Sequence, residues 1–217
     1  IGEVTLIDLD DICVTNTNRQ AHTLGSTLGQ LKVDVMAERL LAINPACKVH
    51  PVADFIATDN LAELLHGALD YVIDCIDSLV PKAALIAWCK RQKIPLITTG
   101  GAGGQVDPTQ VMVADLNKTY HDPLAARLRT RLKKEHGFTR APKKNFGVPC
   151  VFSSEQLRYP TPDGRVCSEK GFVGEGVKLD CAGGFGAAMT VTATFGLVAA
   201  SRALTAIADG KGRPGKS

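Results

Sequence analysis

The sequence contains no pair of cysteines spaced as Cys-x-x-Cys, although seven cysteines are spread along its 217 residues. Structural zinc sites usually take their ligands from such pairs, so we predict that the chain binds no zinc. The cysteine count is odd, the cysteines form no dense framework, and we recognise no secretory signal. These features exclude a disulfide-stapled secreted scaffold and indicate a reducing compartment, the cytoplasm.

A strong charge imbalance is also lacking, since the formal net charge is only +3. This value alone indicates no anionic partner. The chain is 45% hydrophobic and 22% charged, which is ordinary for a globular protein with a substantial core. We therefore predict one α/β domain over residues 1–217, with a flexible basic tail at 209–217.

Polar residues follow the first predicted strand, which covers the apolar and β-branched positions near residues 4–9. Ligands of parallel α/β sheets bind at the carboxyl ends of strands, so these residues form a candidate site. A carboxylate there can hold ribose hydroxyl groups, and arginine or lysine can stabilise phosphate charge. A strand ending in Asp is nevertheless common in α/β proteins without a site. The candidates are Asp8, Asp10, Asn16, Asn18, Arg19 and Lys32.

The combination resembles the adenylation motif of the ubiquitin-activating superfamily, which includes the enzymes that activate sulfur-carrier proteins. That motif has an Asp-x-Asp strand end, an Asn-x-x-Arg-Gln run and a lysine that opens the next helix, here Asp8, Asp10, residues 16–20 and Lys32. The resemblance implies a Rossmann-like, mostly parallel sheet with helices on both faces, a homodimer, and ATP as ligand. It implies ribose binding by Asp8 and a catalytic role at the phosphates for Arg19 and Lys32.

Asp77 and Ser78 end another predicted strand, at residues 71–77. The resemblance implies that Asp77 helps to hold Mg²⁺ and the ATP phosphates, with Ser78 beside it. Alternatively, either residue simply caps the helix predicted at 82–92. Further helices are predicted at 30–43, at 58–65 with Thr58 or Asp59 as the cap, and at 124–136 after the capping residues 121–123. Strands are predicted at 47–53, 94–99 and 106–116. Residues 151–155 and 165–167 are predicted to pair as a hairpin.

A basic segment lies between residues 127 and 144, where Glu135 is the only acid. Such a surplus is typical of polyanion binding, although many charge runs are only solvated surface. Few aromatic residues accompany it, namely Phe138 and Phe146, so we predict contacts to phosphates rather than to bases. The cations are Arg127, Arg129, Arg131, Lys133, Lys134, Arg140, Lys143 and Lys144. The segment belongs to a basic, irregular insertion or crossover region predicted at 118–176.

The superfamily places a strand and a Gly-x-Gly-Gly-x-Gly phosphate loop before its first motif, and this sequence contains no such pattern. We therefore expect an N-terminally incomplete adenylation domain or, alternatively, a protein that is not a complete enzyme. The glycines at 100–104 are not followed by a helical pattern, so we predict a tight turn with close backbone approach.

Four stretches, 14–20, 95–105, 122–127 and 180–186, most resemble the branch of the superfamily that uses ATP to cyclise the threonylcarbamoyl group of a tRNA adenosine. This implies a tRNA partner and an adenylated carboxylate. Two alternatives stay open: an adenylyltransferase for a sulfur-carrier protein, and a non-catalytic nucleotide-binding scaffold.

Cys181 corresponds to a cysteine that related activators use in persulfide or acyl chemistry, which implies a catalytic thiol and a cysteine-desulfurase partner. Alternatively, it is a small buried residue. The uncharged run at 181–201 is long enough to span a membrane. Its Gly, Ala and Thr content instead favours a helix packed closely on the sheet.

Overall fold

The computed structural model describes residues 1–67, 69–161, 165–167 and 186–212. The chain divides into two compact units, Ile1–Ala57 and Thr58–Ser217, and each is described by itself. Cys181 and the tail beyond residue 212 lie outside the described residues, so the predictions for them stay predictions.

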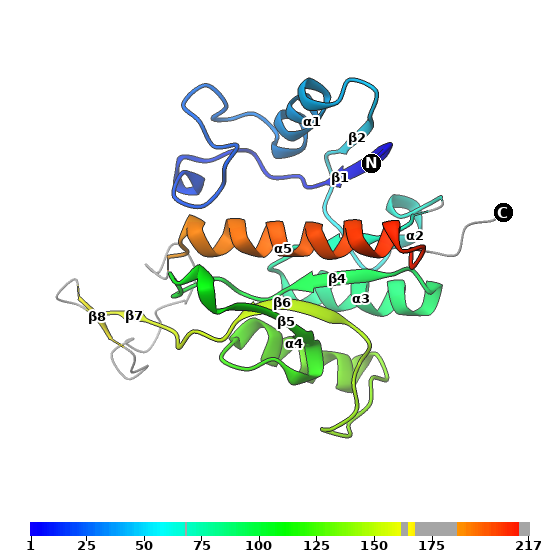
Figure 1. Ribbon diagram of the computed structural model, residues 1–217, viewed down its shortest axis with the longest axis vertical. Coiled ribbons are helices and arrows are strands. Elements are labelled where there is room, and N and C mark those ends of the chain that lie inside the picture. The colour runs from blue at the N-terminus through cyan, green and yellow to red at the C-terminus, as the bar shows by residue number, and fades with distance from the viewer. Residues whose placement is uncertain (68, 162–164, 168–185, 213–217) are drawn as a thin grey trace. The chain divides into compact units, whose positions relative to one another are not determined.

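The first unit contains two parallel strands joined by a helix (Figure 1). Strand β1 (Glu3–Ile7) pairs with β2 (Lys48–Val52), and Glu3 lies opposite Lys48. Parallel neighbours need a crossover connection, which helix α1 (Lys32–Ile43) supplies. Helix α1 begins at Lys32, two residues later than predicted. The loop between β1 and α1 includes a short 3₁₀ helix, η1 (Val14–Asn16), and carries the first group of candidate residues.

The second unit is built on a four-stranded sheet with the order β3–β4–β6–β5. Strands β3 (Val72–Asp74), β4 (Leu96–Thr99) and β6 (Pro149–Ser153) are parallel, and β5 (Val111–Asp115) runs antiparallel to β6. The carboxyl ends of the three parallel strands therefore share one edge of the sheet, as expected for a Rossmann-like α/β fold.

Helices cover both faces of this sheet. Figure 1 shows α5 (Met189–Ala208) on one face, and α3 (Leu79–Gln92) and α4 (Pro123–Glu135) on the other. Helix α4 begins after Asp122, whose carboxylate accepts the N–H of Ala125 at 2.8 Å, which confirms the predicted cap. The shorter elements are α2 (Leu61–Leu64), η2 (Pro108–Gln110), η3 (Leu116–Lys118), β7 (Tyr159–Pro160) and β8 (Val166–Cys167).

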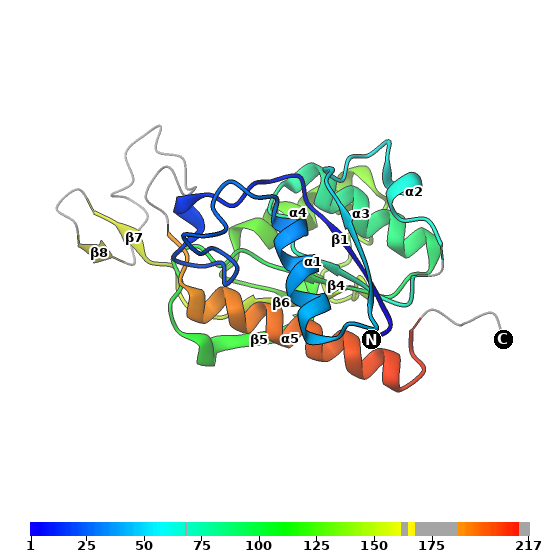
Figure 2. The same cartoon turned by 90° about the horizontal axis from the view of Figure 1, so that it is seen from above.

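Helix α5 lies along β4, β5 and β6, as the turned view in Figure 2 also shows. By length and composition it could cross a membrane. Here its buried face, Val191, Phe195 and Ala199, packs against Ile97 and Val151 of the sheet. This supports the prediction of a packed helix in place of a membrane span. The opposite face stays exposed, including Leu197 and Leu204.

Two predicted elements were wrong in detail. The hairpin predicted between residues 151–155 and 165–167 is wrong, because residues 149–153 form the internal strand β6 and β8 pairs with β7. Four of the five residues of β6 are buried, so the segment shows no alternation that would mark it as a sheet strand. Helix α2 begins at Leu61 after Asn60, rather than after Thr58 or Asp59.

The predicted close backbone approach after β4 is confirmed at Gly100. A Cβ atom there would lie 1.8 Å from Oδ2 of Asp122, a distance that no side chain can tolerate. The same carboxylate accepts the N–H of Gly101 at 3.1 Å. The glycine thus lets the chain pass against a buried carboxylate at the carboxyl edge of the sheet.

Candidate functional site

The end of β1 brings Asp8, Asp10 and Lys32 together. Oδ1 of Asp8 accepts the backbone N–H of Asp10 at 2.8 Å. Oδ2 of Asp10 lies 2.7 Å from Nζ of Lys32, and the Lys32 N–H donates to the Asp10 carbonyl at 3.1 Å. The first residue of α1 is therefore tied to the strand end by both its side chain and its backbone.

The loop is closed by short antiparallel backbone contacts at its base. Asp11 and Leu31 form an isolated bridge. The Ile12 N–H donates to the Gln30 carbonyl at 2.8 Å, and the Gly29 N–H donates to the Ile12 carbonyl at 2.9 Å. Ile12 is buried and anchors this base in the unit. Residues far apart in the loop are thus held at one strand end.

Asn16 and Arg19 are fixed within the loop. Asn16 is buried, and its Oδ1 accepts the Cys13 N–H at 3.0 Å. Nη1 of Arg19 donates to the Thr15 carbonyl at 2.6 Å and to Oδ1 of Asn18 at 3.1 Å. The guanidinium is therefore oriented by the same loop that carries the carboxylates.

Three polar groups at positions 20–23 were not among the candidate site residues. Oε1 of Gln20, Nε2 of His22 and Oγ1 of Thr23 are buried and have no hydrogen-bond partner among the described residues. Burial and the nearby Lys32 charge lower the pKa of His22, opposed by Asp8. Buried polar groups without a partner are rare in folded proteins, which marks this part of the loop as a candidate for ligand contacts. The motif included Gln20, but no sequence signal pointed to His22 or Thr23.

Asp77 and Ser78 belong to the second unit, between β3 and α3 at the carboxyl edge of the sheet, and both are exposed. Ser78 occupies the N-cap position of α3, but its side chain makes no capping hydrogen bond. The capping alternative therefore receives no support from Ser78. The Asp77 carboxylate is available to a ligand at this edge.

A buried ion pair lies just before these residues. Nζ of Lys82 is 3.0 Å from Oδ2 of Asp74, and both side chains are fully buried. Oγ1 of Thr98 donates to the same carboxylate oxygen at 2.7 Å, and the Ile76 N–H donates to Oδ1 at 3.1 Å. This network fixes the end of β3 and the start of α3, and so the segment that carries Asp77. No pattern in the sequence pointed to this role for Asp74 and Lys82.

The structure separates the basic segment into two groups. Arg129 donates to Oγ1 of Thr119, Arg131 pairs with Glu135 at 2.8 Å, and Lys133 lies over the Phe146 ring. The other five cations are exposed and form no ion pair within the described part of the chain: Arg127, Lys134, Arg140, Lys143 and Lys144.

The loop that carries the last cations is held in place from η3. Nδ2 of Asn117 donates to the carbonyls of Ala141, Pro142 and Lys144, the last at 2.8 Å. The exposed charges of this loop are therefore displayed on an ordered backbone.

Carboxylate, histidine and cysteine side chains do not gather in threes anywhere in the described ranges in a way that could hold a metal ion. Asp77 is a single hard oxygen donor. Mg²⁺ commonly takes one or two carboxylates and completes its coordination with substrate phosphates and water. A lone exposed Asp at a strand end fits such an ion when a nucleotide brings the remaining ligands.

The ThiF family model matches residues 1–216. The chain is 58% identical over 204 residues to the tRNA threonylcarbamoyladenosine dehydratase of Escherichia coli K12, covering 94% of this chain and 76% of that protein. The dehydratase of Haemophilus influenzae Rd is 50% identical, with the same coverage. The E. coli dehydratase structure in complex with ATP has 53% identity and a TM-score of 0.83, covering 96% of this chain and 76% of that chain.

Proposed function

The chain belongs to the ThiF family, and from this we infer that it is an ATP-dependent tRNA threonylcarbamoyladenosine dehydratase. The observation that carries this conclusion is the similarity along nearly the whole chain to proteins of that name, at 50–58% identity. The structure also has the Rossmann-like α/β architecture of the ATP-bound relative. The sulfur-carrier and scaffold alternatives have no comparable support.

The reaction needs an activated carboxylate. A carboxylate oxygen of the threonyl group attacks the α-phosphorus of ATP, and pyrophosphate leaves. An oxygen or nitrogen of the carbamoyl group then attacks the acyl carbon, the bond to AMP breaks, and one proton is released. The net change is loss of one water from the modified nucleoside, with ATP converted to AMP and pyrophosphate. The protein must orient the acceptor and stabilise charge at the α-phosphate.

The loop after β1 offers the groups for the nucleotide. We assign the charge at the phosphates to Arg19 and Lys32, which the loop holds in defined positions. Asp8 is assigned to the ribose hydroxyl groups, with Asp10 orienting Lys32 through their 2.7 Å ion pair. Asn16 and Asn18 are assigned to the remaining polar contacts with ATP.

Asp77 and Ser78 are assigned to the phosphate end of ATP. Bound Mg²⁺ would neutralise phosphate charge, and Asp77 fits it as a hard oxygen ligand. The buried Asp74–Lys82 pair keeps this segment at the edge of the sheet.

The five exposed cations of the basic segment are assigned to the phosphates of tRNA. We further propose that the enzyme acts in the cytoplasm as a homodimer, as implied by its tRNA substrate and the superfamily. The proposed chemistry needs no thiol, so a desulfurase partner for Cys181 stays a separate prediction.

The deciding experiment is incubation of the protein with ATP, Mg²⁺ and tRNA that carries threonylcarbamoyladenosine, followed by nucleoside mass spectrometry. We expect loss of one water from the modified nucleoside, with one AMP formed per product. Reactions without ATP, or with tRNA lacking the modification, are the controls. Unchanged nucleoside together with adenylation of a Gly-Gly carboxyl terminus would instead establish the sulfur-carrier alternative.

A further inference from the structure

The second unit has an open pocket of about 360 Å³ that the assignments above leave unused. Its walls come from the loop after β4, from the segment that contains β7 and β8, and from the residues that lead into α5. Gln105, Val106, Arg158, Pro160 and Ala188 are among its lining residues. The loop after β4 leaves the sheet at the same carboxyl edge as the segment that carries Asp77.

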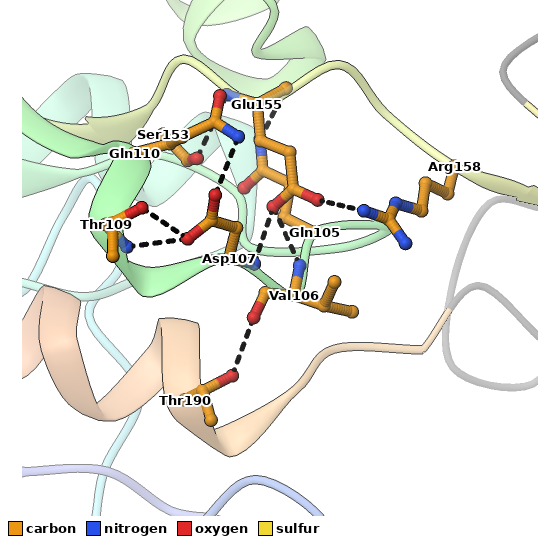
Figure 3. Close-up of polar contacts among 9 residues, drawn as sticks. All are labelled: Gln105, Val106, Asp107, Thr109, Gln110, Ser153, Glu155, Arg158 and Thr190. Carbon is orange, nitrogen blue, oxygen red and sulfur yellow. Dashed lines mark hydrogen bonds and ion pairs between the residues drawn. The ribbon is translucent and has the colours of Figure 1, made fainter.

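Glu155 fixes two of these walls, as Figure 3 shows. It follows β6 by two residues and is 3% exposed. Its Oε2 accepts the N–H groups of Val106 and Asp107, each at 2.8 Å. Its Oε1 lies 3.2 Å from Nη2 of Arg158, whose side chain is 49% exposed. One buried carboxylate therefore holds the loop and orients a guanidinium at the pocket.

Further hydrogen bonds secure the same walls from other elements. Oγ1 of Thr190, in the first turn of α5, donates to the Val106 carbonyl at 3.0 Å (Figure 3). The Gly104 N–H donates to the Gly186 carbonyl, and the Arg158 N–H donates to the Gly104 carbonyl, both at 2.9 Å. The pocket is thus pre-organised by contacts from β6, α5 and the β7 segment.

Gln105 and Glu155 each leave one buried side-chain oxygen without a hydrogen bond from the described residues, although the Glu155 oxygen keeps its ion pair with Arg158. Gln105 is 1% exposed, and its Nε2 donates to the Glu155 carbonyl at 3.4 Å. Its Oε1 is buried and accepts no hydrogen bond from any described residue. A buried acceptor without a donor is unfavourable, so this oxygen gains most from a ligand that brings an N–H or O–H group.

We propose that this pocket binds the threonylcarbamoyl-modified base, with Oε1 of Gln105 accepting an N–H of its ureido group. The inference rests on the proposed function and adds the acceptor subsite to it. The apolar side chains of Val106, Pro160 and Ala188 suit the faces of a planar base. Arg158 presents donors to the carbonyl or carboxylate oxygens of the modification.

Three chemical features of the ligand thus meet three features of the pocket: a flat base, a donor-rich urea and anionic oxygens. Unmodified adenine lacks the outer urea N–H and the anionic oxygens of the modification, so it offers Arg158 no partner. The pocket therefore selects for the modification, whereas the basic segment contacts phosphates in any tRNA.

The test compares Gln105→Met with Thr194→Val. Methionine keeps the length of the side chain but removes the acceptor, whereas Thr194→Val removes only a hydrogen bond within α5, from Oγ1 to the Thr190 carbonyl at 2.7 Å. We expect Gln105→Met to raise the KM for modified tRNA about tenfold, the effect of losing one hydrogen bond to a buried group. ATP affinity and the affinity for unmodified tRNA should stay unchanged. Thr194→Val should change KM less than about twofold, because Thr194 is not among the residues that line the pocket.

Ala188→Leu is the second variant, because it narrows the pocket without touching Gln105. It should raise the KM for modified tRNA and leave ATP binding intact. If Gln105→Met has a lowered melting temperature, its KM no longer reports on the lost hydrogen bond, and Ala188→Leu then provides the test. A wild-type protein that makes no cyclic product would refute the proposed function itself. If the wild type is active and both pocket variants keep its KM, or if both weaken unmodified tRNA equally, the pocket does not bind the modified base.

Discussion

At the scale of single residues, the pair between Lys32 and Asp10 sets the position of a cation at the end of β1. We predict that Lys32→Met lowers the rate of adenylation on the order of 10²–10³-fold, because it removes a charge that acts on the transition state. The pair is partly exposed, so the melting temperature should hardly change. Pyrophosphate release, measured with modified tRNA, provides the rate.

Lys48→Met is a suitable control, since Lys48 is an exposed lysine in the same unit, on β2. It should leave the rate intact. A Lys32→Met protein that releases pyrophosphate at the wild-type rate would remove Lys32 from the site.

Cys13 lies in the loop between β1 and α1, and the rate at which its thiol is alkylated should depend on pH. Oγ1 of Thr15 lies 3.3 Å from its Sγ, and this hydrogen bond is the main cause that lowers the pKa of the exposed thiol. In contrast, burial raises the pKa of Cys89 and Cys150 to about 12. Because the thiolate reacts with iodoacetamide, we predict that Cys13 is alkylated at lower pH than these two cysteines.

Thr15→Val tests the cause, because it removes the hydroxyl and preserves the shape. The pH profile of Cys13 alkylation, followed by peptide mass mapping, should move to higher pH in this variant. An unmoved profile would mean that Thr15 does not stabilise the thiolate.

Single residues also show what the sequence could and could not reveal. Asp8 and Asp77 could be selected because acids that follow a strand in an α/β protein mark a candidate site, and Lys32 because it matches a motif of the superfamily. The neighbours that complete their surroundings could not, since the Asp74–Lys82 pair depends on which side of α3 faces the sheet. Gln105 and Glu155 were missed for a similar reason: their contact joins positions 50 residues apart.

At the scale of elements, the start of α3 depends on a buried charge. We predict that Lys82→Met lowers the free energy of unfolding by about 3–5 kcal/mol, because it leaves Asp74 charged and buried without its partner. Urea denaturation followed by circular dichroism measures this. Lys90→Met, which loses only an exposed bond to the Gly147 carbonyl, should cost less than about 1 kcal/mol. Equal losses in the two variants would show that the buried pair has no special role.

Element boundaries were predictable where capping chemistry is local. The Asp122-Pro123 sequence fixed the start of α4, because Asp accepts a first-turn N–H and Pro suits the first turn of a helix. It was harder to predict from the sequence which strands pair with each other in the sheet. Strand β6 lies between β4 and β5 and is buried on both faces, so its residues carry no alternation, and its neighbours come from distant parts of the chain.

At the scale of the whole molecule, the α/β class followed from strands that alternate with helices, and the order of strands in the sheet did not. The antiparallel direction of β5 depends on a turn at η2, where Pro108 follows Asp107. The Rossmann-like architecture could be predicted because several motifs resemble those of one superfamily. Secondary-structure propensities alone would not have identified it.

The exposed cations of the basic segment are predicted to bind the phosphates of tRNA. Arg140, Lys143 and Lys144 are exposed, and Asn117 holds the backbone of the loop that ends at Lys144. Each phosphate contact releases condensed counterions, so the affinity for tRNA should fall steeply with salt. Replacing these three residues by Gln should weaken tRNA binding and reduce the slope of log K against log salt by roughly two to three units. Filter binding at several salt concentrations measures both.

The matched control replaces three exposed cations elsewhere, Arg39, Lys48 and Lys211, which lowers the net charge equally. A general electrostatic effect would weaken tRNA binding equally in both triple variants. If the basic segment contacts tRNA directly, only the first variant should lose affinity. ATP affinity should be the same in the two proteins. Since phosphates carry no base identity, the first variant should lose affinity for modified and unmodified tRNA by the same factor. A triple variant with wild-type affinity and slope would show that these cations are only solvated surface, and tRNA would then have to be held by other residues.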